Sequence, residues 1–140
     1  MSIHWRRVVL GALLLEIVLF TVLVPIGFVS TTVFLVAVPI GCLLFGYLVT
    51  RWLLRTLSSG LLLHGALLGV LATAMYFGLV LMQPDGLSSA VAVYGVPLFW
   101  FSQAMRIVGC VTGALHVQRR AAVRLPATAP VSVSAAKERM

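Results

Sequence analysis

Carboxylates are the scarcest chemical group in this sequence. Only three of the 140 residues are Asp or Glu, and charged residues of both signs together make up 9%. A soluble domain of ordinary composition carries about 25% charged residues. The shortage therefore excludes a water-soluble globular surface. With 61% hydrophobic residues, the chain has the composition of a domain that lies in a lipid bilayer.

The sequence also lacks the local motifs of common catalytic sites. It contains no glycine-rich nucleotide loop, no His-Glu-x-x-His, no Cys-x-x-Cys and no Gly-x-Ser-x-Gly. Its two cysteines, Cys42 and Cys110, lie in separate apolar runs without a local metal-ligand spacing, and free cysteine commonly serves as a small buried apolar residue. We therefore expect no enzyme activity, no cofactor and no metal.

Basic residues dominate the few charges that are present, and the formal net charge is +7. Nine of the ten Lys and Arg residues lie outside the apolar runs, most of them at the ends of these runs. Flanking basic residues are typical of membrane spans. We therefore expect the lipid bilayer, and no nucleic acid, as the partner of this basic charge.

Four apolar stretches predict four membrane-spanning helices, because each is close to the about 20 residues that a span requires. Their expected ranges are about 6–25, 32–51, 59–82 and 89–118. Pro97 suits the first turn of a helix, so the membrane helix covers about 97–118 with 88–96 as a short outer segment. One kinked helix over 89–118 is the alternative. The four helices form one domain over 1–118. The segment 119–140 is basic and rich in Ala, Ser, Thr and Pro, which predicts a disordered cytoplasmic tail.

The basic residues also predict an orientation, because they fall on one side of a four-helix topology. By the positive-inside rule both termini are cytoplasmic. Tyr76 and Trp100 would mark the opposite boundary, about 30 Å away at 1.5 Å per residue. The predicted fold class is an all-α, integral membrane, four-helix transmembrane bundle that runs up-down-up-down. We expect a multi-pass protein of a bacterial cytoplasmic membrane.

Small residues at helical spacing predict where the helices pack. The third apolar stretch contains Gly65-x-x-x-Gly69, and the fourth contains Gly109-x-x-x-Gly113. Such spacing lets two backbones approach closely. Arg106 shares a helix face with Gly109 and Gly113 at 100° per residue, so this face is expected to point into the bundle. Packing within one chain is the simplest use of these glycines, and packing between copies is the alternative.

Three ionisable residues lie inside the apolar stretches. Glu16 follows Arg7 by nine residues, His64 follows Arg55 by nine, and Arg106 precedes Arg119 by thirteen. At 1.5 Å per residue these spacings give depths of about 14 Å, 14 Å and 20 Å. A charge at the bilayer centre costs about 2.5–3.5 kcal/mol on insertion scales. We therefore predict an intramembrane polar cluster of Glu16, Arg106 and His64.

This cluster has three interpretations. The first is a structural ion pair between Glu16 and Arg106 that only fixes the order of the helices. The second is a proton- or ligand-coupled site. In the third, Glu16 is protonated and neutral within the membrane.

The run Leu10-Gly11-Ala12-Leu13-Leu14-Leu15-Glu16 resembles the first helix of the small multidrug resistance transporters. The resemblance covers about ten residues and implies a four-helix protein that exchanges protons for cationic drugs as a dimer. It also implies that Glu16 is the proton and substrate site. This chain departs from that family by its basic tail and by Arg106, which would neutralise the carboxylate, and the family is not assigned.

The function that the sequence favours is that of a small multi-pass membrane protein without catalytic activity. We expect an accessory, assembly or interaction subunit that packs against another membrane protein. The alternative is a small transporter that works as a homo-oligomer and couples to protons through Glu16. These two hypotheses differ in the oligomeric state and in whether Glu16 is paired.

Overall fold

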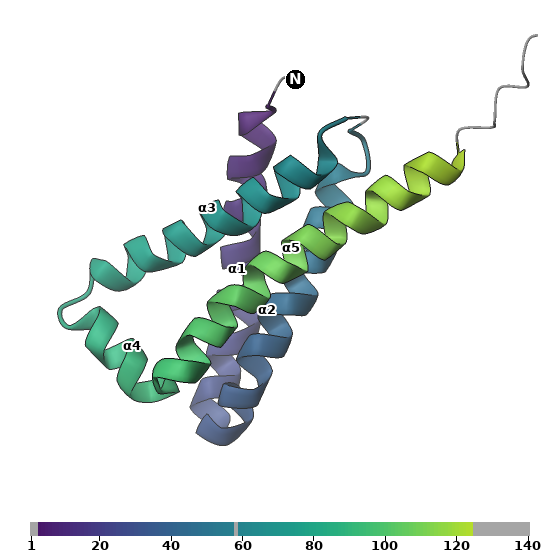
Figure 1. Cartoon of the computed structure of the whole chain (residues 1–140). Helices are drawn as coiled ribbons and strands as arrows, with labels where there is room; N and C mark the ends of the chain where they lie inside the picture. The colour runs from purple at the N-terminus through teal and green to yellow at the C-terminus, as the bar shows by residue number, and fades with distance from the viewer. Residues whose placement is uncertain (1–2, 58, 125–140) are drawn as a thin grey trace, which may run out of the picture.

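The computed structural model describes residues 3–57 and 59–124, which form five helices (Figure 1). The helices are α1 (Trp5–Val29), α2 (Thr31–Leu54), α3 (Leu61–Leu81), α4 (Gly86–Tyr94) and α5 (Val96–Arg124). Four of them, α1, α2, α3 and α5, are long and apolar enough to cross a membrane. The described part of the chain is therefore all-helical, with the composition of a membrane protein.

The fourth apolar stretch forms two helices in the structure, which corresponds to the predicted helix start near Pro97. The chain breaks at Gly95, whose backbone has φ 71° and ψ 148°, a conformation that is essentially restricted to glycine. The short helix α4 therefore precedes a separate α5, which begins one residue before Pro97. The α5 helix also continues to Arg124, so residues 119–124 are helical and not part of a tail. Residues 125–140 lie outside the described residues.

Gly95→Ala is expected to lower the free energy of unfolding by about 1–3 kcal/mol, because an L side chain is strained at this φ and ψ. No heavy atom lies within 4 Å of the position that a Cβ would take at Gly95, so the loss would come from the backbone alone. Unfolding in detergent micelles, titrated with dodecyl sulfate, measures this difference. An unchanged free energy would contradict the break at this residue.

The α5 helix occupies the centre of the packing, with its most extensive contacts to α2 and then to α3. In Figure 1 it crosses in front of the α1–α2 hairpin, and α4 joins its beginning to the end of α3. Glycines make the α2–α5 crossing close. A Cβ at Gly113 would lie 2.6 Å from the Tyr47 carbonyl oxygen, and one at Gly109 would overlap the Leu43 carbonyl oxygen.

The glycines of α3 also pack within the chain. A Cβ at Gly65 would lie 2.5 Å from the Cβ of Ala114, and one at Gly69 would lie 3.0 Å from the Cα of Ile107. Both neighbours belong to α5. The two predicted small-residue faces therefore meet α5 and α2 of the same chain, as close backbone approach requires.

Several contacts show which segments meet at each end of the helices. At one end, the backbone N–H of His4 donates to Nε2 of His64 at 3.0 Å, and Arg7 donates to Thr56 at 2.6 Å. At the other end, the rings of Phe34 and Tyr94 lie 5.6 Å apart. The start of α1 therefore lies beside the α2–α3 connection, and α4 lies beside the start of α2.

Candidate functional site

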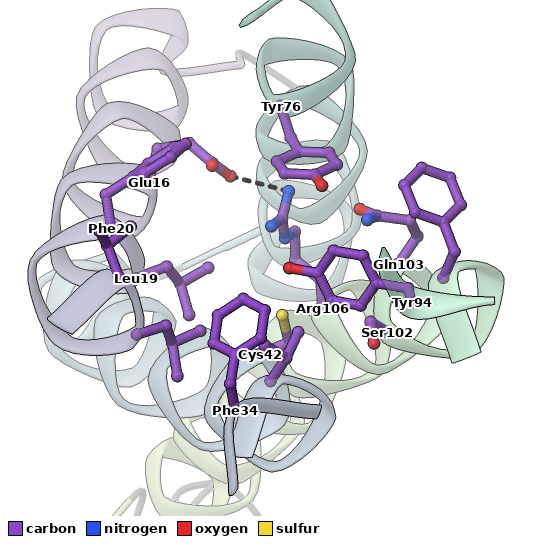
Figure 2. Close-up of a pocket in the computed structure, with 14 residues that line it drawn as sticks. Glu16, Leu19, Phe20, Phe34, Cys42, Tyr76, Tyr94, Ser102, Gln103 and Arg106 are labelled. Atoms are coloured by element: carbon purple, nitrogen blue, oxygen red, sulfur yellow. Dashed lines mark ion pairs between the residues drawn. The ribbon is translucent and has the colours of Figure 1, made fainter. Parts of the chain in front are cut away.

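Glu16 and Arg106 form an ion pair inside the helices, with 2.9 Å between Oε1 of Glu16 and Nη1 of Arg106. Each side chain is 4% exposed. Glu16 comes from the middle of α1, and Arg106 comes from the first half of α5. Figure 2 shows the two side chains reaching toward each other from opposite walls. The long arginine side chain thus spans the distance between two helices whose side chains lean in different directions.

Other groups hold the guanidinium of Arg106 in place. The carbonyl oxygen of Ala72 accepts a hydrogen bond from Nη1 at 3.4 Å. The ring of Tyr76 lies 4.8 Å from Cζ, a cation–π distance. Both come from α3, so the arginine links α5 to α1 and to α3 at one level. Tyr76, which was predicted to mark a membrane boundary, thus also contacts this arginine.

A cavity of about 60 Å³ adjoins the ion pair and is lined by residues of all five helices. Its polar lining includes Gln103, Ser102 and Tyr94 beside the two charged groups (Figure 2). Cys42 contributes a sulfur to the same wall. A water molecule needs about 10–15 Å³ of such space. The cavity is therefore large enough for about four water molecules or a few atoms of a polar ligand.

Several buried polar atoms at this cavity have no hydrogen-bond partner among the described residues. They include both carboxylate oxygens of Glu16, Nε of Arg106 and Oε1 of Gln103. The short Glu16–Arg106 distance is thus a charge contact whose atoms are not aligned for a hydrogen bond. Buried polar groups without a partner are rare. The lining therefore offers two acceptors, the Glu16 carboxylate and Oε1 of Gln103, and one donor, Nε of Arg106, to water or to a small polar ligand.

His64 lies apart from this cluster, contrary to the prediction. Its Nε2 accepts from the backbone N–H of His4, and its Nδ1 lies 2.7 Å from the carbonyl oxygen of Gly60. A carbonyl oxygen can only accept, so Nδ1 carries the proton and the ring is neutral. His64 therefore ties the start of α1 to the first turn of α3 and does not contact Glu16 or Arg106.

Gln103, Tyr94 and Ser102 were not predicted from the sequence as residues of one cavity with Glu16. A signal for two of them was present, because Ser102 and Gln103 lie four and three residues before Arg106 and share its side of the helix. Tyr94 had no such signal. It reaches the cavity only because the chain turns at Gly95.

No protein-family model, no curated protein and no solved structure matches this chain. Within the described ranges, His, Cys, Asp and Glu side chains form no group of three or more that could hold a metal ion. The two cysteines are buried and free. The site is therefore defined by its own geometry, as a buried ion pair beside a small polar cavity.

Proposed function

We propose that this chain is a small, non-enzymatic membrane protein that packs against a transmembrane helix of a partner protein as an accessory or interaction subunit. The observation that supports the proposal is an open notch at Gly78. This residue lies in the last turn of α3, and no heavy atom lies within 4 Å of the position that a Cβ would take there. The helix-packing glycines Gly65, Gly69, Gly109 and Gly113 all have close neighbours.

The Gly78 notch belongs to a groove of about 470 Å³ between α1 and α3. Leu13, Ile17 and Thr21 line it from α1, and Met75 and Leu79 line it from α3. Apart from Glu16 and Thr21 the lining residues are apolar, and Gly78 adds no side chain to the groove. Small residues let a second helix approach closely within a membrane. An apolar helix of a partner is therefore the occupant that this groove fits.

The proposed topology places both termini in the cytoplasm, with the four long helices running up-down-up-down. Arg7 and Thr56 meet at one end of the helices, and Arg51 and Arg120 line one groove. The positive-inside rule assigns this end to the cytoplasm. The proposed location is a bacterial cytoplasmic membrane.

The alternative, a proton-coupled carrier, needs a carboxylate that can exchange a proton or a cation. The 2.9 Å contact with Arg106 supplies Glu16 with a fixed countercharge inside the protein. A cation would have to displace a buried guanidinium from the carboxylate, at the cost of leaving a charge unpaired. The ion pair therefore favours a structural use of Glu16.

Site-specific photocrosslinking in native membranes tests the proposed partner contact. A photoreactive amino acid at position 79 would face the groove, whereas one at position 44 would face lipid outside it. Leu79 and Leu44 are 44% and 49% exposed, so they form a matched pair. We expect an adduct with another protein from position 79 and only lipid adducts from position 44. Gly78→Trp should fill the notch and abolish the protein adduct.

Three outcomes would overturn the interaction proposal. They are lipid adducts alone from both positions, equal protein adducts from both positions, and an adduct between two copies of this chain from position 79. The last outcome would support the homo-oligomeric carrier. Transport assays on Glu16→Gln in vesicles would then measure whether the carboxylate takes part.

A further inference from the structure

A second groove, of about 610 Å³, lies between the last turns of α2 and the second half of α5. Arg51 lines it from the last turn of α2, Arg55 lines it from the position directly after α2, and Arg120 lines it from α5. It is separate from the Glu16–Arg106 cavity and shares no lining residue with it. Its volume falls within the about 300–1,000 Å³ of small-molecule sites. Three arginines from two separate parts of the chain thus line one depression of the surface.

The described part of the chain offers these three arginines no carboxylate. Of its two acidic residues, Glu16 pairs with Arg106, and Asp85 lies in the α3–α4 connection. The C-terminal end of a helix favours cations, which accounts for an arginine in the last turn of α2. This preference does not explain why Arg120, which belongs to α5, lines the same groove as Arg51. The excess positive charge favours an anion in the groove.

The groove has a polar half and an apolar half. Leu48 and Val117 line it on the side of the apolar spans, one turn or less before the arginines. Trp52 is 54% exposed, and its ring lies 5.7 Å from Cζ of Arg55. Tryptophan is typical of the membrane interface. An occupant with a negative head and an apolar tail would match both halves of the groove.

We propose that this groove binds the headgroup of an anionic phospholipid, with the phosphate between Arg51, Arg55 and Arg120 and an acyl chain along Leu48 and Val117. Arginine suits phosphate because its planar guanidinium can donate two parallel hydrogen bonds. Basic pockets between transmembrane helices are known lipid-headgroup sites. The proposal rests on the membrane placement of the four long helices and, for the leaflet, on the proposed topology.

The test uses the full chain in nanodiscs of phosphatidylcholine, with brominated phosphatidylglycerol added as the probe. Trp52 serves as the reporter in a Trp5→Phe, Trp100→Phe background, because bromine quenches an adjacent indole. The groove variant is Arg51→Gln with Arg120→Gln. The control variant is Arg6→Gln with Arg119→Gln, which removes the same charge from exposed arginines outside the groove.

Any arginine near an anionic leaflet contributes about fivefold in affinity, whereas an arginine that donates to the bound phosphate contributes about tenfold or more. We therefore expect the groove variant to weaken phosphatidylglycerol quenching about 100-fold or more, and the control variant to weaken it by no more than about 25-fold. Equal weakening in the two variants would overturn the proposal, since general surface charge would then explain binding. Circular dichroism checks that each variant keeps its helices.

Competition with inorganic phosphate and with glycerophosphoglycerol distinguishes a lipid from a soluble anion. We expect neither headgroup analogue to displace the lipid at concentrations similar to that of the lipid. Displacement at similar concentration would overturn the lipid assignment and indicate a soluble phosphate site. A fluorescent reporter fused to the C-terminus measures the topology separately. An outward C-terminus would contradict the proposed function's orientation without changing the nanodisc result, because both leaflets contain the probe.

Discussion

Glu16→Gln is expected to lower the free energy of unfolding by about 3–5 kcal/mol, because it leaves the guanidinium of Arg106 buried without its countercharge. Arg106 is 3% exposed, so it cannot recover hydration without moving. Its remaining partners are one carbonyl oxygen of Ala72 and the ring of Tyr76. Dodecyl sulfate titration of the protein in detergent micelles, followed by tryptophan fluorescence, measures the loss.

The reverse variant, Arg106→Gln, should destabilise the protein less. The isolated carboxyl of Glu16 can become neutral by taking a proton, whereas a guanidinium stays charged at every accessible pH. The double variant Glu16→Gln, Arg106→Gln buries two neutral amides. We expect it to be more stable than the sum of the single losses predicts, with a coupling of about 0.5–3 kcal/mol. Additive losses would show that the two charges do not stabilise each other.

The scarcity of charge is what made this ion pair predictable. Glu16 is the single acidic residue in the apolar stretches, and Arg106 is the single basic one. A buried charge without a partner is unfavourable in a membrane, so composition alone favoured this pairing. Both residues also lie well within continuous helices. For Arg106, the spacing of thirteen residues to Arg119 therefore measured a distance along a single helix.

The predicted position of His64 beside the ion pair was wrong for a physical reason. Its depth was estimated from Arg55 at 1.5 Å per residue, a rise that holds only within a helix. The α2 helix ends at Leu54, and α3 begins at Leu61. His64 is therefore the fourth residue of its helix, near the end where the chain turns. Its hydrogen bonds to His4 and Gly60 belong to that turn.

The sequence predicted a break or a kink near Pro97 but did not decide between them. Twelve glycines are spread through the chain, and most of those in helices allow close packing and do not end the helix. Pro97 predicted a helix start nearby, but a proline in the first turn is also compatible with a kink. The positive φ of Gly95 decides between these outcomes, and that angle depends on how α4 packs against α5.

Gly109→Ala is expected to lower the free energy of unfolding by about 3 kcal/mol, through steric overlap between two backbones. The new Cβ would overlap the carbonyl oxygen of Leu43, which is fixed within α2 and cannot rotate away. Overpacking of a core typically costs about 1–3 kcal/mol, and a rigid neighbour places this site at the upper end. The same unfolding titration measures the difference.

Gly78→Ala is the matched control for this substitution, because Gly78 is also within a long apolar helix and has no neighbour within 4 Å. In the isolated chain we expect it to leave stability unchanged or to raise it by up to about 1 kcal/mol, the difference in helix propensity. Equal stability of the two variants would contradict the close α2–α5 crossing. A large loss at position 109 alone would show that the α2–α5 crossing requires glycine at this position. The same crossing positions Arg106, which lies three residues before Gly109.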